Sequence, residues 1–207
     1  MKDIIVITGP TGVGKTALSI SLAKKINSEI INADSMQFYK YLNIGTAKIK
    51  EEEKDGVKHH LFDIVSPEEM YTIYDYQKDA RKKIEEIIKR GKKVIIVGGS
   101  GLYIRAALYD YKLEEENIKL NFDDLSNEEL YKKALEEDSF ITIHPNNRKR
   151  LIRFLEKSKL GKKEIPKAEK LYDFDIIGLT TERSVLYDKI NKRVDKMLEE
   201  GLLDEVR

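Results

Sequence analysis

The segment from residue 4 to residue 16 constrains the fold of this 207-residue chain more than any other. Its first part, Ile4 to Thr8, is a run rich in β-branched residues, which predicts a strand buried on both faces of a sheet. The run leads into Gly9-Pro-Thr-Gly-Val-Gly14-Lys15-Thr16, which fits the phosphate-binding P-loop pattern at every defined position. Apolar residues at helical spacing then predict a helix over residues 15–26. This order of elements predicts an anion held on backbone amides at the helix N-terminus.

A P-loop names the bound group and leaves the reaction open. In this pattern glycines let backbone N–H groups turn toward an anion, Lys15 adds a positive charge, and Thr16 offers a hydroxyl to Mg²⁺. A glycine-rich turn without a ligand is the disfavoured alternative, because pattern and context agree. P-loop proteins that hydrolyse a nucleotide usually carry an acid after an apolar strand. Here the apolar run 94–97 ends in Gly98-Gly99, which favours transfer chemistry.

The remaining apolar runs predict one α/β domain. Further strands are expected at 30–31, 60–65, 94–97 and 174–179, and helices over 74–90, 102–108, 183–200 and from 202 onward. Alternating strands and helices predict a parallel sheet flanked by helices, as in P-loop NTPases. Acidic side chains are frequent between residues 110 and 138, and basic ones between 148 and 170. We therefore expect a small helical insertion over 111–171, with 1–110 and 172–207 forming the α/β core.

Composition excludes several classes of protein. The chain has no cysteine, so disulfides and thiolate metal sites are excluded. No apolar run approaches the roughly 20 residues that a membrane-spanning helix needs. The apolar run at the N-terminus is too short for a signal peptide and has no cleavage region, so we expect none. We expect a cytoplasmic protein that does not bind membranes. The formal net charge of +1 gives no indication of nucleic acid, and the sequence does not predict the oligomeric state.

Two polar segments should meet the P-loop at the carboxyl edge of the sheet. Asp34 follows the second predicted strand and Ser100 follows the strand at 94–97, and ligands of such sheets bind at that edge. A carboxylate there could accept a proton, although Asp34 could equally serve a turn and Ser100 a helix cap. His59 and His60 are adjacent and would point in opposite directions along a strand. We expect them to have a structural role and not to bind a metal.

Several blocks, taken in order, resemble the tRNA dimethylallyltransferases, also called isopentenyltransferases. They begin with the P-loop and continue through short motifs to the last residues of the chain. The blocks are Gly9 to Thr16, Asp34-Ser35-Met36-Gln37 with Tyr39-Lys40, Gly45-Thr46-Ala47-Lys48, His59-His60-Leu61 with Asp63, Gly98 to Tyr103, His144-Pro145-Asn146 with Arg150, Arg153, Leu155 and Glu156, and Arg183, Leu186-Tyr187, Ile190, Arg193-Val194, Gly201-Leu202 and Glu205-Val206. Each block is modest, but the ordered set is specific and covers nearly the whole chain.

The resemblance implies that a dimethylallyl group passes from its diphosphate to N6 of adenosine 37, beside the anticodon of a tRNA. It implies that Asp34 accepts the proton of the adenine amine and that Ser100, where the family usually has Thr, helps to orient the substrate. Magnesium, bound by Thr16, is the expected cofactor. The implied diphosphate-binding residues are Gly9, Thr11, Gly12, Gly14, Lys15, Thr16 and Arg183. The implied tRNA-binding residues are Asp34, Ser35, Met36, Gln37, Lys149, Arg150 and Arg153, with the anticodon stem-loop as partner.

Some features depart from the family pattern. Ile49 stands where the family commonly has Pro, Asn147 stands where Asp is usual, and the insertion is short. Family members usually continue for roughly a hundred further residues, so we expect the C-terminal part to be lacking. Two other functions remain open from the residues alone: a P-loop kinase acting on a small molecule, and a non-catalytic P-loop module that binds RNA. For the run 148–153 taken alone, a solvated helix face is the alternative to phosphate contact.

Overall fold

The computed structural model describes residues 2–111, 120–159 and 168–207. The chain divides into two compact units, the first made of Met1–Leu113 and Glu169–Arg207 and the second of Glu114–Ala168. The sequence prediction divides the chain at residues 110 and 172. Residues 112–119 and 160–167, which fall within the predicted insertion, lie outside the described residues.

The first unit is built on a five-stranded sheet with the order β3-β2-β4-β1-β5. Its strands are β1 (Ile4–Thr8), β2 (Ser28–Asn32), β3 (His59–His60), β4 (Lys93–Val97) and β5 (Phe174–Gly178). Every strand pair in the sheet is parallel, with Ile5 opposite Ile95 across the central pair. The predicted α/β fold with a parallel sheet is confirmed.

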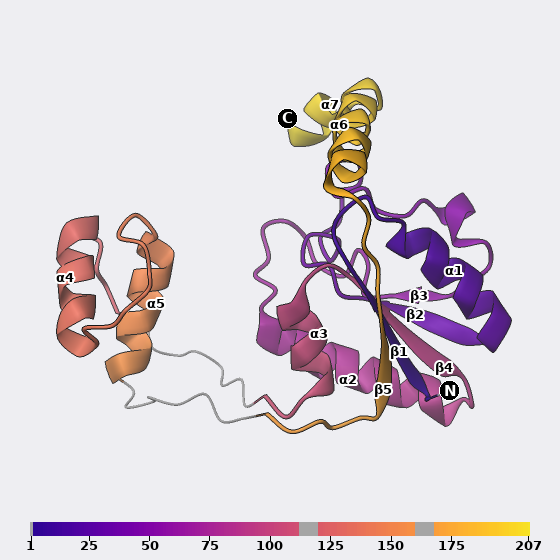
Figure 1. Cartoon of the computed structure of the whole chain (residues 1–207), viewed down its shortest axis with the longest axis horizontal. Coiled ribbons are helices and arrows are strands. Elements are labelled where there is room, and N and C mark those ends of the chain that lie inside the picture. The colour runs from indigo at the N-terminus through magenta and orange to yellow at the C-terminus, as the bar shows by residue number, and fades with distance from the viewer. Residues whose placement is uncertain (1, 112–119, 160–167) are drawn as a thin grey trace. The chain divides into compact units, whose positions relative to one another are not determined.

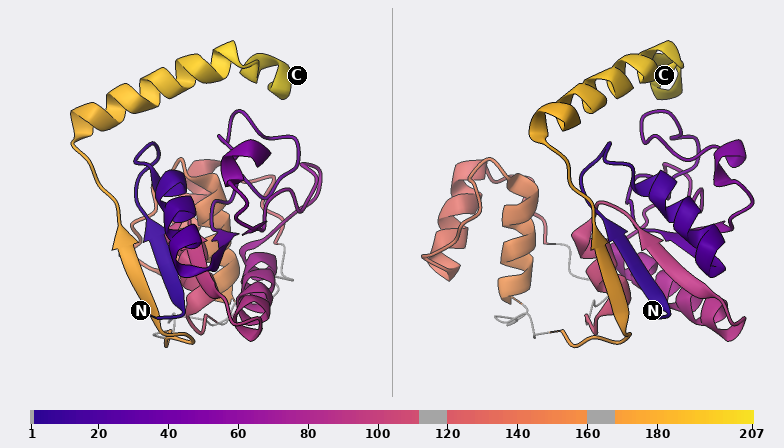
Figure 2. Two further views of the ribbon diagram at one scale, coloured as in Figure 1. Left: turned by 90° about the vertical axis from the view of Figure 1, so that its right-hand side faces the viewer. Right: turned by 45° about the vertical axis from the view of Figure 1, so that its right-hand side comes forward.

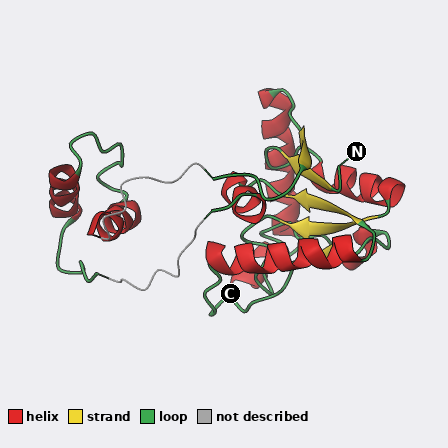
Figure 3. Ribbon diagram, turned by 90° about the horizontal axis from the view of Figure 1, so that it is seen from below, coloured by secondary structure: helices red, strands yellow, loops and turns green. Residues whose placement is uncertain are grey.

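Helices cover both faces of this sheet (Figure 1 and Figure 3). Helix α1 (Lys15–Ile26) lies on one face, and α2 (Ile73–Lys89) and α3 (Gly101–Leu108) lie on the other. A short 3₁₀ helix, η1 (Glu51–Lys54), precedes β3. After β5 the chain forms α6 (Arg183–Glu199) and α7 (Leu202–Val206), which pass across the carboxyl ends of the strands (Figure 2).

Alternation along each strand divides the core between the two faces. Ile5 and Ile95 belong to the cluster that includes Ala23 of α1. Their neighbours Val6 and Ile96 belong to the cluster on the α2 side. Successive side chains of a strand point to opposite faces, so a strand covered on both sides must be apolar throughout. The continuous β-branched runs of the sequence are therefore explained by this sandwich of sheet and helices.

The third predicted strand is wrong over most of its length. The prediction covers 60–65, whereas β3 ends at His60. Leu61 and Asp63 have φ angles of 60° and 52°, in the left-handed region, and such residues cannot continue an extended strand. The chain therefore leaves the sheet immediately after β3 and turns toward the loop that follows β2.

Within its described residues, 120–159 and Ala168, the second unit contains the helices α4 (Asn127–Glu137) and α5 (Arg148–Lys159). Leu130 and Ala134 of α4 pack with Leu151 and Leu155 of α5 in a separate small core. Helix α4 starts with a capping box, in which Ser126 and the first turn exchange side-chain and backbone hydrogen bonds.

Candidate active site

A pocket of about 1220 Å³ lies at the carboxyl ends of the strands in the first unit. Residues of the P-loop, Asp34 after β2, and Arg193 and Lys196 of α6 all contribute to its lining. A smaller pocket of about 400 Å³ shares Thr11, Asp34 and Arg193 with it. The phosphate loop and the acid after β2 therefore face common cavities, which is the arrangement expected at the edge of a parallel sheet.

The P-loop backbone has the shape that its glycines permit. Gly12 and Gly14 have φ angles of 81° and 95°, in the left-handed region. Gly9 has a φ of 150°, and a Cβ atom there would lie 2.4 Å from the carbonyl oxygen of Leu179. Glycine at this position lets the loop lie directly against the segment after β5. The N-terminus of α1 follows at Lys15, so the positive end of its dipole lies at the pocket.

Lys15 of the P-loop is one of the cations that line the pocket. Its Nζ donates hydrogen bonds to the carbonyl oxygens of Gly9, at 2.9 Å, and Pro10, at 2.7 Å. Burial lowers the pKa of Lys15, Asp34 counteracts this effect, and the positive charge of Arg193 lowers the pKa further. The ammonium group thus lies within electrostatic reach of both the carboxylate after β2 and the guanidinium on α6.

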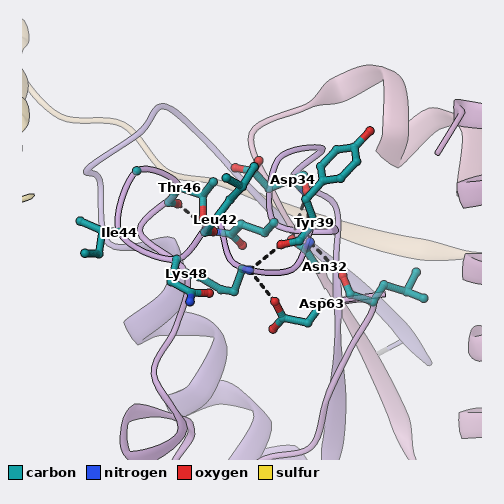
Figure 4. A network of polar contacts seen from close by, with 12 residues as sticks. Asn32, Asp34, Tyr39, Leu42, Ile44, Thr46, Lys48 and Asp63 are labelled. Carbon is teal, nitrogen blue, oxygen red and sulfur yellow. Dashed lines mark hydrogen bonds and ion pairs between the residues drawn. The ribbon is translucent and has the colours of Figure 1, made fainter. Parts of the chain in front are cut away.

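Asp34 is held by the end of β2 (Figure 4). The buried Asn32 accepts a hydrogen bond from the Asp34 backbone N–H at 2.9 Å, and its amide group donates to the carbonyl oxygen of Leu61 at 3.1 Å. Oδ1 of Asp34 in turn accepts a hydrogen bond from the backbone N–H of Met36 at 3.1 Å. Asp34 therefore shapes a turn and lines the pocket at the same time, so the two interpretations of this residue are compatible.

The loop after β2 is braced by its own side chains (Figure 4). Nζ of Lys48, whose side chain is only 5% exposed, donates to the carbonyl oxygen of Tyr39 at 2.7 Å and pairs with Asp63 at 2.6 Å. Gln37 donates its side-chain amide to the carbonyl oxygen of Thr46 at 3.0 Å. Gln37, which was expected to bind tRNA, thus supports the pocket wall with its side-chain amide.

The other predicted residues lie at different distances from the pocket. Ser35 and Met36 follow Asp34 directly, and Met36 is half exposed. Ser100 occupies the N-cap position of α3 without a side-chain capping bond and is not among the residues that line either pocket. Arg183, exposed at the start of α6, is likewise outside both linings. Arg193 lies in a sequence block of the resemblance, but its position at the pocket was not predicted.

The basic run of the insertion divides into two kinds of residue. Lys149, Arg150 and Arg153 are exposed on α5. Arg148 is instead partly buried and donates hydrogen bonds of 2.6 Å to the carbonyl oxygens of both Phe122 and Leu125. Arg148 therefore holds the loop before α4, whereas the three exposed residues leave their cationic side of α5 accessible to solvent.

The two histidines have structural contacts. His60 lies 2.6 Å from the buried carboxylate of Glu29, which also pairs with Arg90 and Lys92. The ring of His59 hydrogen bonds to the carbonyl oxygen of Val57 at 2.8 Å. Within residues 2–111, 120–159 and 168–207 no group of three His, Asp or Glu side chains could hold a metal ion. Nor does any helix in these ranges have the length and apolar character required to cross a membrane.

Comparisons with known proteins agree with this geometry. The family model described as IPP transferase matches residues 37–207. The tRNA dimethylallyltransferase of Bacillus licheniformis is 49% identical, and the match covers 99% of this chain and 70% of that protein. The enzyme of the same name from Bacillus subtilis is 46% identical, with 100% and 71% covered.

Solved structures give the same result. The tRNA isopentenylpyrophosphate transferase of Bacillus halodurans superposes with a TM-score of 0.70 at 42% identity, covering 99% of this chain and 69% of that one. A eukaryotic dimethylallyltransferase acting on tRNA superposes with a TM-score of 0.79 at 32% identity, covering 99% and 55%. With a phosphate loop and a carboxylate on one pocket, and with matches along nearly its entire length, this chain belongs to the tRNA dimethylallyltransferase family.

Proposed function

We propose that this protein transfers the dimethylallyl group of dimethylallyl diphosphate to N6 of adenosine 37 in tRNA. Membership of the family supports the reaction class. The single observation that carries the proposal is that Lys15 and Asp34 line the same pocket. A leaving diphosphate needs positive charge and N–H donors, whereas an amine that is alkylated needs a proton acceptor. The pocket offers both groups within one cavity.

The diphosphate binds at the P-loop in this proposal. The amides around Gly12 and Gly14, the ammonium of Lys15 and the N-terminus of α1 all favour an anion. The resemblance assigns the contact from α6 to Arg183, but Arg193 and Lys196 are the α6 cations that line the pocket. We therefore assign the additional charge on the diphosphate to Arg193 and Lys196.

The transfer forms a bond between N6 of adenine and C1 of the dimethylallyl group. The bond between C1 and the diphosphate oxygen breaks, and its electron pair leaves with the diphosphate. Lys15 and the loop amides stabilise the negative charge that develops on that oxygen. Asp34 accepts the proton lost by N6, because it is the carboxylate that lies both on the pocket and within electrostatic reach of Lys15.

Magnesium fits the residues of this pocket as an ion held mainly by substrate. Mg²⁺ usually keeps several waters and takes only one or two protein ligands beside phosphate oxygens. Thr16 lines the pocket at the first turn of α1 and would supply one hydroxyl. When bound, the ion neutralises charge on the leaving diphosphate.

The tRNA approaches from the side of Asp34, Ser35 and Met36. Adenosine 37 has to leave its stack to reach the pocket, at a cost of a few kcal/mol. The exposed residues Lys149 and Arg150 of α5, together with Arg153, would offset this cost through phosphate contacts. We therefore propose the insertion as a tRNA-contacting region.

The decisive experiment measures transfer of radiolabelled dimethylallyl from its diphosphate to unmodified tRNA, with ATP as a competing ligand. We expect label in the tRNA, at adenosine 37, and weak competition by ATP. Tight ATP binding together with phosphate transfer to a small molecule would favour a kinase. Binding of tRNA without transfer of label would instead favour a non-catalytic RNA-binding module.

A further inference from the structure

The carboxylate of Glu205 in α7 occupies a ring of backbone N–H groups that belongs to a distant loop. Its Oε2 accepts hydrogen bonds from the backbone N–H groups of Asn43 and Ile44, both at 2.7 Å. Its Oε1 accepts a third from Gly45 at 2.9 Å. Successive N–H groups that converge on one point form an anion-binding nest. In this protein the nest is filled by a side chain 160 residues away along the sequence.

Two further contacts join this loop to the C-terminal part of the chain. A Cβ atom on Gly45 would lie 3.1 Å from Cδ1 of Leu202, so α7 packs directly on the loop backbone. Beyond the nest, Lys50 pairs with Glu200 at 3.2 Å. The loop from Asn43 to Lys50 is therefore attached to the C-terminal helices at more than one point, with Glu205 making the most hydrogen bonds.

Glu205 makes these contacts as an anion. Burial disfavours its charged form, but the three hydrogen bonds from backbone N–H groups and the nearby charge of Lys48 outweigh burial and lower its pKa. Hydrogen bonds to an ionised carboxylate are stronger than those between neutral groups. At neutral pH the hydrogen bonds between the Glu205 carboxylate and the loop amides are therefore charge-assisted.

The loop and Glu205 form the rim of the opening beside Asp34. Gly45, Thr46, Leu202 and Glu205 line the smaller pocket together with Asp34. Thr46 is also the residue whose carbonyl oxygen accepts the amide of Gln37. A shift of this loop would therefore change the shape of the opening through which a base must pass to reach Asp34.

We propose that Glu205 is a positioning residue for the tRNA substrate. By holding the amides of 43–45 it fixes the wall of the opening beside Asp34, and its three hydrogen bonds all go to this loop and not to the P-loop. This inference rests on the proposed function, because it concerns the side on which the tRNA enters. It also brings together residues of two short sequence blocks, Gly45 to Lys48 and Glu205-Val206, which are far apart in the chain but meet in space.

Two variants and one control test this role by steady-state kinetics on the full chain. Glu205→Ala removes both acceptor oxygens and with them all three hydrogen bonds. We expect the KM for tRNA to rise about tenfold or more, as loss of a charged hydrogen-bond acceptor implies. The KM for dimethylallyl diphosphate should stay within about twofold of its normal value, because the substitution removes no group of the P-loop that binds the diphosphate. In Glu205→Gln the amide oxygen can still serve Asn43 and Ile44, but its NH₂ group faces the N–H of Gly45, so an intermediate rise is expected.

Asp204→Asn is the matched control. It removes one negative charge from the same helix at the neighbouring position, where the side chain is 82% exposed. Its kinetics should equal those of the unchanged protein. An equal effect of Asp204→Asn and Glu205→Gln would overturn the proposal, because general charge would then explain the result. A lower KM for tRNA in Glu205→Ala would also overturn it, because the nest would then be a phosphate site that Glu205 blocks.

Amide hydrogen exchange separates this inference from the proposed function. In the unchanged protein the N–H groups of Ile44 and Gly45 should be protected, and Glu205→Ala should abolish that protection while α1 and α2 retain theirs. If the unchanged protein transfers no dimethylallyl group, the proposed function fails, and the exchange result still shows whether Glu205 holds the loop. Unchanged protection in Glu205→Ala would overturn the positioning role even in an active enzyme.

Discussion

A Cβ atom on Gly98 would lie 2.3 Å from the carbonyl oxygen of Ala33. These residues follow β4 and β2, which are neighbours in the sheet, and the backbone N–H of Ala33 donates to the carbonyl oxygen of Val97 at 2.8 Å. Glycine is required here because of the close approach of two backbones. Since Asp34 is the next residue after Ala33, this approach also determines where the carboxylate stands relative to the P-loop.

Gly98→Ala should therefore reduce both stability and transfer. The added methyl group must push the strand ends apart, and overpacking of this kind costs about 1–3 kcal/mol. We expect the free energy of unfolding to fall by that amount in denaturant titrations. The rate of dimethylallyl transfer should fall by more than the decrease in the fraction of folded protein explains. Gly99→Ala is the matched control, because its Cβ would be 3.7 Å from the nearest atom, the carbonyl oxygen of Gly9. Equal losses in the two variants would contradict the steric explanation.

Asp34→Ala should nearly abolish transfer while leaving the diphosphate in place. A general base typically contributes a factor of about 100 to 10,000, so kcat should fall by at least about 100-fold. The affinity for dimethylallyl diphosphate, measured by calorimetry, should remain close to normal because the P-loop is unchanged. Asp34→Asn keeps the acceptor for the Met36 N–H and distinguishes the two roles of the side chain. Turnover equal to that of the unchanged protein would remove Asp34 from the mechanism.

Arg150→Ala and Arg148→Ala should have different effects, although only Lys149 separates the two residues on α5. Arg150 is exposed, and its loss should weaken tRNA binding and reduce the slope of log affinity against log salt by about 1. Arg148 holds the carbonyl oxygens of Phe122 and Leu125, and its loss should destabilise the second unit by about 1–3 kcal/mol. Amide exchange of α4 reports that second effect. An unchanged salt slope in Arg150→Ala would identify the cationic side of α5 as a solvated face.

The Glu29 network should make stability depend on pH in the acid range. Burial of Glu29 raises its pKa, but His60, Lys92 and Arg90 outweigh burial and lower the pKa to about 2. A carboxyl group whose pKa is lower when folded stabilises the protein above its unfolded pKa of about 4.3, and this contribution is lost as pH falls toward 2. The shift corresponds to an effect on the order of 3 kcal/mol at pH 7.

Glu29→Gln tests this assignment by denaturant unfolding between pH 7 and pH 3. The variant should be less stable than the unchanged protein at pH 7, and the difference should shrink steadily below about pH 4.5. Asp3→Asn, in which an exposed carboxylate of the same unit is changed, serves as the comparison. A stability difference that stays constant across this range would show that the charge of Glu29 does not provide the stabilisation.

Much of the fold was predictable because its signals are local. The strand at Ile4–Thr8 and the helix at Lys15–Ile26 have the predicted bounds, since β-branched runs and helical periodicity record burial directly. The end of β3 was not predictable in this way. It depends on left-handed residues, Leu61 and Asp63, and on the ion pair between Asp63 and Lys48, which is a tertiary contact.

The candidate site shows the same division. The P-loop has a sequence pattern, and the rule for parallel sheets correctly indicates that Asp34 faces the same cavity. The position of Arg193 depends on how α6 crosses the strand ends, and no local pattern records that crossing. The partners of Glu205 are backbone amides, which every residue except proline possesses, so the nest has no signature in side-chain types.

The two chain segments that lead to and from the insertion are hydrogen-bonded to each other at the α/β unit. Tyr109 and Lys170 form an antiparallel bridge, the N–H of Asp110 donates to Glu169 at 2.8 Å, and the N–H of Leu171 donates to Leu108 at 2.9 Å. With its ends joined, the intervening chain can grow or shrink at an entropic cost of only about 0.6 kcal/mol per doubling. Evolution can thus alter the length of this appendage, and an engineer can graft another in its place, while the sheet keeps its register.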